Sequence, residues 1–461
     1  MAKKLGPLDL YRKLPKTNCG ECGEKTCMAF ASQLIERKYK PKDCPYLKEK
    51  PLEELTELLS PAIRQVEFGL GKNIVKIGGE DVMYRHELTY FNQTAIALDV
   101  HDEMSDEELL ERVKFVSDFS FERVGEKLTL DAVAIRNKSQ DAEKFASCVE
   151  RVSKATEKAL ILCSFGVEAM DRALNVCGGK RPLVYTATHK TWEEMGSLAL
   201  EHNCPVVAFA ENDLSELKSM VNVLQNLGLK EICIDPGSNP QKKGFADTFS
   251  NFVMARRAGI QQDDMLINCP LIGIPAAAYL EKTQDDELKE VMLGAAMIDR
   301  FCDLIIIHSI EVYSILPLIT LRQNIYTDPR KPKGVDAGLY EFGEPDENSP
   351  VLMTTNFALT YYTVESDIQA GNLDCFLLVV DTDSYGVDTA VAGGQLTSLK
   401  VKELIEETKI ADRVRRKRLI IPGLAARLSG EIEQVSGWEV LVGPRDSSQI
   451  PGYVDKMLGE K

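Results

Sequence analysis

The sequence predicts an α/β protein built in successive parts, and three observations support this. Four cysteines crowd into residues 19–44, a stretch too short to bury a core of its own. Between about residues 65 and 325, short apolar runs alternate with charged helical stretches, and the alternation returns on a smaller scale from 351 to 461. We therefore predict a metal-organised module at 1–60, a (β/α)8 TIM barrel at 61–328, a linker at 329–350, and a C-terminal doubly wound, Rossmann-like domain at 351–461.

The cysteines Cys19, Cys22, Cys27 and Cys44 follow the spacing C-x2-C-x4-C-x16-C. Zinc usually takes two well-separated C-x2-C pairs, so three clustered cysteines and a remote fourth favour a 4Fe–4S cluster over zinc. Gly20 and Gly23 would let the backbone approach the sulfides. Within the module, Thr26–Lys38 and Glu53–Leu59 have the periodicity of short helices.

The overall composition excludes some partners. The formal net charge of −16 argues against nucleic acid or an anionic membrane as the main partner. The chain shows no apolar run long enough to span a bilayer, and its first residues lack the apolar core of a signal peptide. The remaining eight of the 12 cysteines sit singly, mostly in apolar runs, as buried small residues do. We expect a reducing, cytoplasmic location.

The central region contains eight strand-like runs, which fit a closed barrel of parallel strands, with an open doubly wound sheet as the alternative. Asp106–Phe115, Ala142–Thr156 and Leu214–Leu227 are among the helices between them. Lys72–Ile77 and Val82–His86 are expected to form a hairpin at the bottom of the barrel. The eight runs are Thr94–Val100, Leu130–Asn137, Ala159–Phe165, Pro182–Thr188, Pro205–Ala210, Glu231–Gly237, Leu266–Ile272 and Asp303–Ile310.

Polar residues at the carboxyl ends of these strands would lie on the ligand face of a barrel. They are Asp99, Asn137, Thr188, Asp235, Asn268 and His308. Asp99 and Asp235, with Asn268, could act as general acids and bases, or all six could serve strand-end structure or partner binding. No pair has a spacing that demands catalysis, so the sequence predicts no catalytic residue.

The C-terminal region predicts four strands and three helices of a small doubly wound domain, whose ligand would lie at the strand carboxyl ends. The loops there are small, hydroxylic and glycine-rich, which suits a large polar ligand but is also ordinary turn chemistry. A flavin or a nucleotide is a second option, although no G-x-G-x-x-G follows the first strand. The elements are Val351–Thr354, Ala358–Ala370, Cys375–Asp381, Ser398–Lys409, Arg418–Ile421, Leu424–Gln434 and Trp438–Val442.

Histidine usage adds to this picture. All five histidines lie at or before His308, so none is in the C-terminal domain. If that domain holds a corrinoid, it has no histidine to ligate the cobalt from below. The absence of a strong axial donor makes low-valent cobalt easier to reach, which suits a low-potential iron–sulfur partner.

With these residues in view, the whole chain resembles the large (gamma) subunits of corrinoid iron–sulfur proteins, found in acetyl-CoA decarbonylase/synthase complexes. The resemblance spans all three parts, and the combination of motifs is specific, although the cysteine module alone is shared with other electron-transfer proteins. The motifs are Leu14–Gly23, Cys44–Tyr46, Tyr84–His86, Ala132–Arg136, Arg322–Pro329, Asn348–Pro350, Thr354–Tyr362, Ile420–Gly423 and Gly437–Arg445.

The resemblance implies a methyl carrier of one-carbon metabolism, and of methanogenesis where the flux allows it. Cob(I)amide would accept a methyl group from a methylated tetrahydropterin or tetrahydrofolate and pass it to the nickel–iron–sulfur cluster of acetyl-CoA synthase, or the reverse. The 4Fe–4S cluster would reduce accidentally oxidised cobalt. The implied partners are a small (delta) barrel subunit, forming a heterodimer, and the acetyl-CoA synthase subunit. The barrel is implied to dock the partner rather than bind the pterin, which lowers the weight on Asp99 and Asp235.

Site residues carry over by position. The four cysteines named above become the cluster ligands, and the chain becomes a methyltransferase subunit with a base-off corrinoid. The implied corrinoid contacts are Thr354, Thr355, Asn356, Thr360, Ser384, Tyr385, Gly386, Val387, Pro422, Gly423, Gly443 and Pro444. The alternative from another class is an iron–sulfur electron-transfer protein whose C-terminal domain binds a nucleotide or flavin.

Overall fold

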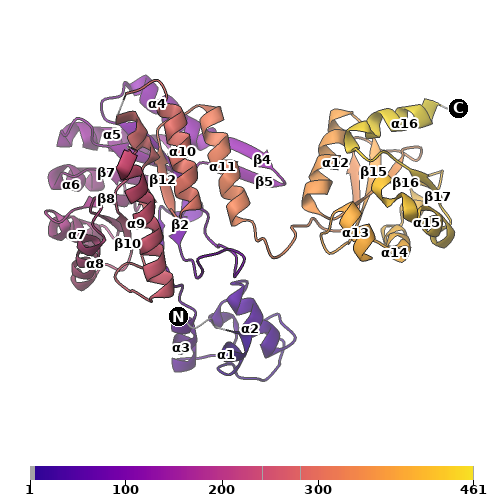
Figure 1. The fold of residues 1–461 in the computed structure, drawn as a ribbon, viewed down its shortest axis with the longest axis horizontal. Helices are drawn as coiled ribbons and strands as arrows, with labels where there is room; N and C mark the ends of the chain where they lie inside the picture. Colours follow the sequence, from indigo (N-terminus) through magenta and orange to yellow (C-terminus); the bar gives the residue numbers. More distant parts are fainter. Residues whose placement is uncertain (1–5, 241, 281, 460–461) are drawn as a thin grey trace. The chain divides into compact units, whose positions relative to one another are not determined.

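The computed structural model describes residues 6–240, 242–280 and 282–459 (Figure 1). Internal contacts divide the chain into two units, one made of residues 1–120 with 129–327 and the other of 121–128 with 328–461. Among the described residues, no helix is both long and apolar enough to cross a bilayer.

The N-terminal segment folds around a small apolar core that includes Phe30, Leu34 and Leu55. Its helices are α1 (Pro7–Tyr11), α2 (Cys27–Ile35) and α3 (Lys50–Leu58), with a 3₁₀ turn at Pro41–Asp43. Helix α2 begins one residue later than predicted because Thr26 is its N-cap, with its hydroxyl 3.1 Å from the amide of Ala29. It ends before the predicted Lys38, since Arg37 takes a left-handed φ of 53°.

The central region is a closed parallel barrel, as predicted. Within the described residues, eight strands pair in the order β10-β9-β8-β7-β6-β3-β12-β11, every pair parallel. A bridge between Ile234 and Leu271 joins β10 to β11 and closes the ring. The strands are β3 (Ala95–His101), β6 (Ala132–Arg136), β7 (Ala159–Cys163), β8 (Leu183–Ala187), β9 (Val206–Phe209), β10 (Ile232–Asp235), β11 (Ile272–Gly273) and β12 (Leu304–Ile307).

Helices follow the strands and surround the ring (Figure 1). Helix α8 has the predicted bounds, with Asp213 as N-cap and Gly228 in the left-handed region at its end. The eight helices of the described barrel are α4 (Asp106–Asp118), α5 (Ala142–Ala155), α6 (Val167–Val176), α7 (Trp192–Glu201), α8 (Leu214–Leu227), α9 (Lys242–Gln261), α10 (Asp286–Asp299) and α11 (Val312–Tyr326).

A two-stranded hairpin closes one end of the barrel, but its strands differ from the prediction. β1 (Gln65–Phe68) pairs with β2 (Val75–Gly78), whereas Val82–His86 forms no strand. Val66 and Phe68 are fully buried and pack in the same cluster as the barrel interior. The alternating residues of β1, which precede β2 in the chain, therefore supply its partner strand. Gly78 and Gly79 both have a left-handed conformation, and they turn the chain at the end of β2.

Three further strands correct the predicted organisation. The hairpin of β4 (Ser120–Arg123) and β5 (Glu126–Thr129) was not expected, and its residues 121–128 belong by contact to the second unit. The predicted linker 329–350 contains β13 (Gly338–Phe342), which pairs antiparallel with β15. Lys333–Val335 also bonds to the loop after β14, through Val335 N to Asn356 O at 2.9 Å. The linker therefore shortens to its first few residues.

The C-terminal domain is the predicted doubly wound sheet with one added edge strand. Its order is β13-β15-β14-β16-β17, and every pair but the β13 edge is parallel. Apolar clusters cover both faces of the sheet. Its remaining strands are β14 (Val351–Thr355), β15 (Cys375–Val380), β16 (Arg418–Ile421) and β17 (Glu439–Val442). Its helices are α12 (Ala358–Ala370), α13 (Val387–Gly393), α14 (Ser398–Thr408), α15 (Ser429–Ser436) and α16 (Ile450–Gly459), with a 3₁₀ turn at Gly423–Leu428 before α15.

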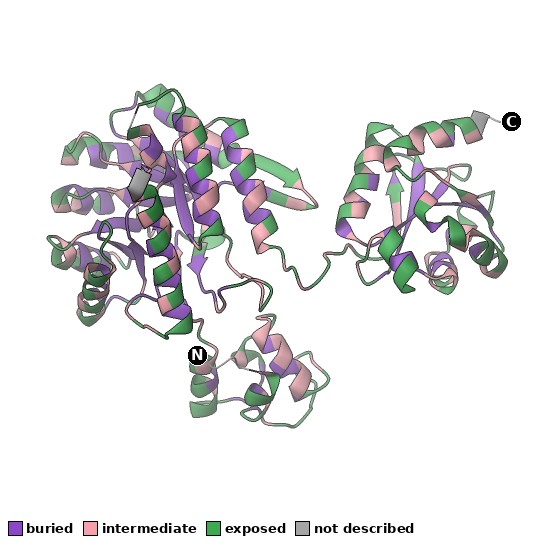
Figure 2. Cartoon of the chain, in the orientation of Figure 1, coloured by how far each residue is buried: buried purple, intermediate pink, exposed green. Residues whose placement is uncertain are grey.

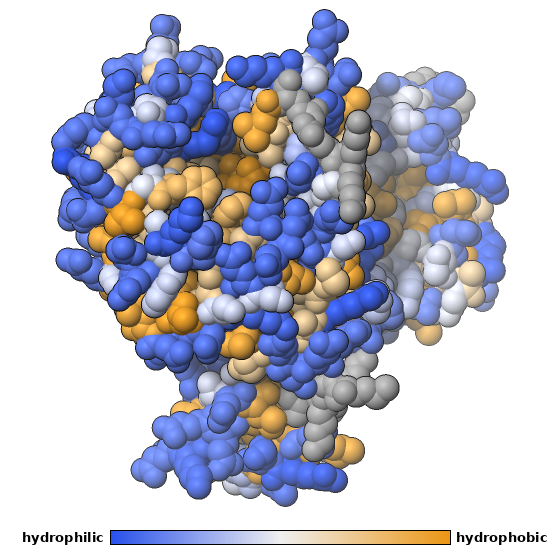
Figure 3. Space-filling model, turned by 60° about the vertical axis from the view of Figure 1, so that its left-hand side comes forward, coloured by the Kyte–Doolittle hydropathy of each residue, from blue (hydrophilic) through white to orange (hydrophobic). Residues whose placement is uncertain are grey.

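Burial follows this layering. In Figure 2 the buried residues trace the strands of both sheets and the inner sides of the helices, while the outer sides are exposed. The face in Figure 3 is largely hydrophilic, with hydrophobic side chains in small groups, as expected for a chain of net charge −16.

Candidate functional site

Three of the four predicted cluster cysteines pack together in the N-terminal segment. Cys27 and Cys44 are buried, and they pack with half-buried Cys22 in one apolar cluster, while Cys19 is exposed. Burial raises the pKa of Cys44, and the neighbouring Cys22 and Cys27 add to the effect. Cys27 opens helix α2, and Asn18 Oδ1 accepts a bond from its amide at 2.9 Å. A helix N-terminus favours negative charge, so this position suits a thiolate.

The loop that carries the first three cysteines needs glycine. Gly23 has a φ of +92°, and a Cβ there would lie 2.9 Å from the hydroxyl of Tyr39. Nearby, the Tyr46 hydroxyl donates to Glu21 at 2.7 Å, beside Cys19 and Cys44. Four cysteine thiols are the ligand set that a 4Fe–4S cluster uses, so the residues present fit such a cluster.

The spacing of the thiols matters for the choice of metal. Among the described residues, no three His, Cys, Asp or Glu side chains are placed to hold one metal ion. A single zinc draws its sulfurs to about 2.3 Å from one point. A 4Fe–4S cube instead carries each thiolate on a different iron, so its four sulfurs stand further apart.

In the C-terminal domain, Asn356 organises the loops at the strand ends. Its Oδ1 accepts bonds from Thr382 N at 2.9 Å, Thr382 Oγ1 at 3.0 Å and Ser384 N at 3.0 Å. Its Nδ2 donates to Asp381 at 3.2 Å. Asn356 was predicted as a ligand contact, but its side chain instead hydrogen-bonds the loop that contains Asp383 and Ser384. Both of these residues have a left-handed backbone conformation.

Glycines bring backbone close at two points of the same sheet edge. Gly386 is the N-cap of helix α13, and a Cβ there would lie 3.7 Å from the Thr360 hydroxyl of α12. Gly423 N bonds to Pro444 O at 2.9 Å, and a Cβ at Gly423 would lie 2.8 Å from Gly443 O. The strand-end residues predicted as ligand contacts therefore form two adjoining groups, after β14 and β15 and after β16 and β17.

Two buried hydroxyls at this edge lack partners. Thr354 is 1% exposed and Thr355 fully buried, and neither Oγ1 makes a hydrogen bond within the described residues. Buried polar groups normally find a partner, so a ligand with polar groups would satisfy them. This site has two hydroxyls without partners and glycines that leave the backbone accessible, and the domain has no histidine. These features fit a large cofactor whose metal takes no axial ligand from the protein, such as a base-off corrinoid.

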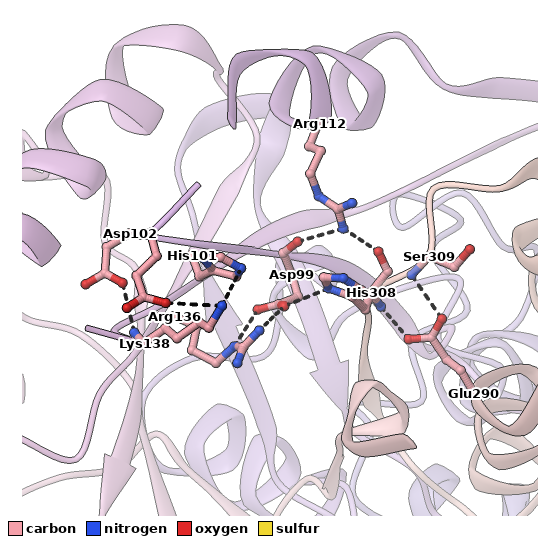
Figure 4. Close-up of polar contacts among 10 residues, drawn as sticks. Asp99, His101, Asp102, Arg112, Arg136, Lys138, Glu290, His308 and Ser309 are labelled. Atoms are coloured by element: carbon pink, nitrogen blue, oxygen red, sulfur yellow. Dashed lines mark hydrogen bonds and ion pairs between the residues drawn. The ribbon is translucent and has the colours of Figure 1, made fainter. Parts of the chain in front are cut away.

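At the barrel mouth, three charged residues meet at the carboxyl ends of β3, β6 and β12 (Figure 4). Asp99 lies between Arg136 and His308. Its carboxylate is 2.7 Å from Nη2 of Arg136 and 3.0 Å from Nδ1 of His308. Burial by itself would raise the pKa of Asp99, but the hydrogen bonds and positive charges of His308 and Arg136 outweigh it and lower the pKa. Asp99 is therefore a buried anion.

The backbone around His308 is held from two sides (Figure 4). Glu290 accepts bonds from the amides of His308 and Ser309, the latter at 3.0 Å. Arg112 donates to the carbonyls of His308 and of Asp99, the latter at 3.1 Å. These two residues were not predicted, because both come from helices and no strand-end pattern marks them.

The other polar residues predicted at strand ends do not join this group. Asp235 accepts from the Tyr185 hydroxyl at 2.8 Å inside the barrel, where burial raises its pKa to about 6. Asn137 donates to Ser164 at 3.0 Å, and Thr188 pairs with Thr191. The prediction for Asn268 was wrong, because it precedes the short β11 and donates to the carbonyl of Ala62 instead.

The pattern that marks the barrel-mouth group is a two-residue period. Ala95 and Ala97 face the barrel interior, and Asp99 is next in that series. Ala132, Ala134 and Arg136 repeat it on β6, and Leu304, Ile306 and His308 repeat it along β12. Arg136 was missed as a site residue, although this alternation could have identified it.

Comparison with known proteins places the chain in context. A family model described as "CO dehydrogenase/acetyl-CoA synthase delta subunit" matches residues 65–454, and one described as "Putative Fe-S cluster" matches residues 14–46. The acetyl-CoA decarbonylase/synthase complex subunit gamma of Methanothermobacter thermautotrophicus is 49% identical, over 98% of this chain and 99% of that protein. The gamma subunit of Methanocaldococcus jannaschii is 40% identical, over 100% of this chain and 98% of its own.

Solved structures show a weaker similarity to about half of this chain. A dihydropteroate synthase from Xanthomonas albilineans is 12% identical with a TM-score of 0.41, covering 57% of this chain and 99% of that one. This similarity is too low to support any statement about function.

Proposed function

This chain belongs to the gamma-subunit family of acetyl-CoA decarbonylase/synthase complexes, and from that premise we propose that it carries methyl groups on a corrinoid held by its C-terminal domain. The observation that carries the proposal is the strand-end site of that domain. Its buried orphan hydroxyls and close-approach glycines suit a large cofactor, and the domain offers no histidine to the metal.

The chain's own residues would hold two groups. Cys19, Cys22, Cys27 and Cys44 would ligate a 4Fe–4S cluster, in agreement with the iron–sulfur family match over residues 14–46. The strand-end loops of the C-terminal domain would bind the corrinoid, with Thr354 and Thr355 as hydroxyl partners. When bound, the corrinoid supplies the cobalt that takes and gives the methyl group, and the cluster supplies the electron that restores oxidised cobalt.

The finer assignments belong to the same proposal. The methyl donor would be a methylated tetrahydropterin or tetrahydrofolate, and the chain would act as a methyltransferase subunit. Its partners would be the small (delta) subunit and the acetyl-CoA synthase subunit of the complex, in the cytoplasm. Family membership supports these assignments. The net charge of −16 disfavours nucleic acid as a further partner.

The experiment is a titration of the full chain with cobinamide, a corrinoid without its lower base, followed by visible spectroscopy. The proposal expects binding, and Gly423→Ala should weaken it by about tenfold or more, because the new Cβ meets three backbone atoms within 2.9 Å. Gly430→Ala is the matched control, since nothing lies within 4 Å of its Cβ position. No binding by a folded wild-type chain would overturn the proposal.

The cysteine assignment has a separate test. Cys22→Ala should abolish reductive reactivation of the carrier while methyl transfer from chemically pre-reduced protein survives. Cys148→Ala, which alters a buried cysteine of the barrel helix α5, should leave both unchanged. Reactivation at the wild-type rate in Cys22→Ala would remove that residue from the ligand set.

A further inference from the structure

We propose that a cavity at the end of the barrel where the strands begin binds a small organic cation, such as a primary ammonium, with Glu80 as its counter-ion. The cavity is lined by Asp303, which precedes β12, whereas His308 of the barrel mouth follows that strand. The site lies within the barrel unit alone and is independent of the proposed corrinoid site.

The cavity has a volume of about 300 Å³, which is at the lower end of the range for ligand pockets. Its walls come from the segment after β2, from helices α9, α10 and α11, and from the residues that precede β12. Four of the lining residues are exposed, so the cavity is open to solvent. They are Tyr84, His86, Asp299 and Arg300.

Glu80 is a buried carboxylate in this cavity that has no ion pair among the described residues. It is 4% exposed, and its oxygens accept hydrogen bonds from the amides of Phe91 and Asn92 at 3.1 Å. These amides fix the position of the carboxylate, but they are neutral and do not balance its charge. Burial therefore raises the pKa of Glu80 to about 7. A cation in the cavity would stabilise the ionised form.

The other charged groups that line the cavity already have partners. Arg256 pairs with Asp303 at 2.6 Å at the inner wall, and Arg300 pairs with Asp299 at the rim. Arg85 donates to carbonyls at the end of helix α11, at 2.5 and 3.2 Å. The carboxylate of Glu80 is thus the lining charge that a ligand can match.

The walls favour an organic cation over a metal ion. Among the described residues, no three His, Cys, Asp or Glu side chains are placed to hold a metal ion. The rings of Tyr90 and Tyr326 lie 5.7 Å apart, and Ile298 and Phe301 add apolar surface. Aromatic rings attract ammonium groups, and apolar side chains suit the carbon atoms that such a ligand carries.

The charges around Glu80 decide how binding depends on pH. Negative groups oppose its ionisation and positive groups favour it. Tyr90 and Tyr326 stay neutral near pH 7, because burial raises their pKa, that of Tyr90 to about 12. The negative groups are Asp299 and Asp303, the positive groups are Arg85, Arg256 and Arg300, and His86 at the rim is positive when protonated.

The test uses calorimetry on the full chain at pH 8 with two probes of equal length. n-Butylammonium carries the charge, and n-butanol does not. Wild type should bind n-butylammonium at least about tenfold more tightly than n-butanol, and Glu80→Gln should lose that preference. Glu57→Gln, which alters an exposed glutamate of helix α3, is the matched control and should bind both probes as wild type does.

Proton release gives a second readout. A cation lowers the pKa of Glu80, so the affinity of wild type for n-butylammonium should rise with pH through about 7 and then level off. Calorimetry at about pH 6.5 in two buffers of different ionisation enthalpy should show proton release on binding to wild type. Glu80→Gln should show no such release.

Equal binding of the two probes by wild type would overturn the inference, and this comparison needs no variant to fold. So would failure of n-butylammonium to bind, or unchanged binding in Glu80→Gln. A pH profile that persists in Glu80→Gln would assign the titration to His86 and contradict the role of Glu80. Failure of the proposed function looks different, because it would appear as a chain that binds no cobinamide.

Discussion

Two aspartate–arginine pairs lie near the two ends of strand β12 and differ in how far they are buried. Before the strand, Asp303 meets Arg256 at 2.6 Å, and both side chains are 2% exposed. After the strand, His308 reaches Asp99, whose other partner Arg136 is 2.7 Å away and 41% exposed. The first pair is sealed inside the barrel, and the second opens on its mouth.

The two pairs also differ in what else their aspartates contact. Asp303 also accepts the amide of Leu271 at 2.7 Å, so its pair ties β11 to helix α9 and serves the closed ring. Burial raises the pKa of Asp303, whereas that of Asp99 is lowered, because a second cation bonds to Asp99. Both side chains of the first pair are almost completely buried, whereas the Arg136 side chain of the second pair is in reach of solvent.

The largest expected effect is on stability, at the sealed end. Arg256→Met leaves the carboxylate of Asp303 buried without its partner, and we expect a loss of about 3–5 kcal/mol in the free energy of unfolding. Arg300→Met, which removes an exposed partner of Asp299, should change it by less than about 0.5 kcal/mol. Urea unfolding measures both. A similar small loss in the two variants would erase the distinction between the ends.

A smaller effect is expected from Glu80, which is 4% exposed and lies close to the sealed pair. Burial raises its pKa to about 7. Because the folded pKa exceeds the unfolded one, the stability that Glu80 contributes is complete below about pH 4 and is lost as the pH rises through about 7.

Glu80→Gln should therefore be more stable than wild type at pH 8, by about 1–3 kcal/mol, and equal to it near pH 4. Urea unfolding at both pH values checks this, with the exposed Glu57→Gln as control. A wild-type stability that rises between pH 5 and 8 relative to Glu80→Gln would contradict the sign.

The smallest stability effect is expected at the open end. Asp99→Asn should cost only about 1–2 kcal/mol at neutral pH, because Arg136 can turn toward water. The pKa of Asp99 is lowered in the fold, so its contribution is present at neutral pH and disappears as the pH falls through that lowered value. The variant should thus approach wild-type stability in acid. A larger stability loss in Asp99→Asn than in Arg256→Met would reverse the assignment of the two ends.

Much of this architecture follows from the sequence, because periodic patterns specify local structure. Seven of the eight barrel strands overlap the predicted runs well, and helices α8 and α12 have the predicted bounds, whereas β11 was expected at Leu266–Ile272 and shares only Ile272 with that run. The pairing of strands that are far apart in the sequence is harder to predict from local patterns. β13 and the β4–β5 hairpin are short and half-polar, and the partner of β2 lies upstream of a 3₁₀ turn.

The site was predictable to a similar degree. The cysteines stand out by spacing, and Asp99 and His308 by their place at strand ends. The contacts of Arg112 and Glu290 depend on how helices pack over the mouth, which no local pattern records. The use of the Asn356 side chain within its own loop likewise depends on the conformation of residues 382–384.

The most direct measurement of the central claim is metal analysis with a visible spectrum on the anaerobically purified chain and its partner subunit. A corrinoid carrier with one cluster should hold about one cobalt and about four iron atoms per chain, with a base-off corrinoid spectrum. Iron without cobalt, together with failure to bind added cobinamide, would contradict the carrier function. Zinc in place of iron would contradict the cluster assigned to the N-terminal cysteines.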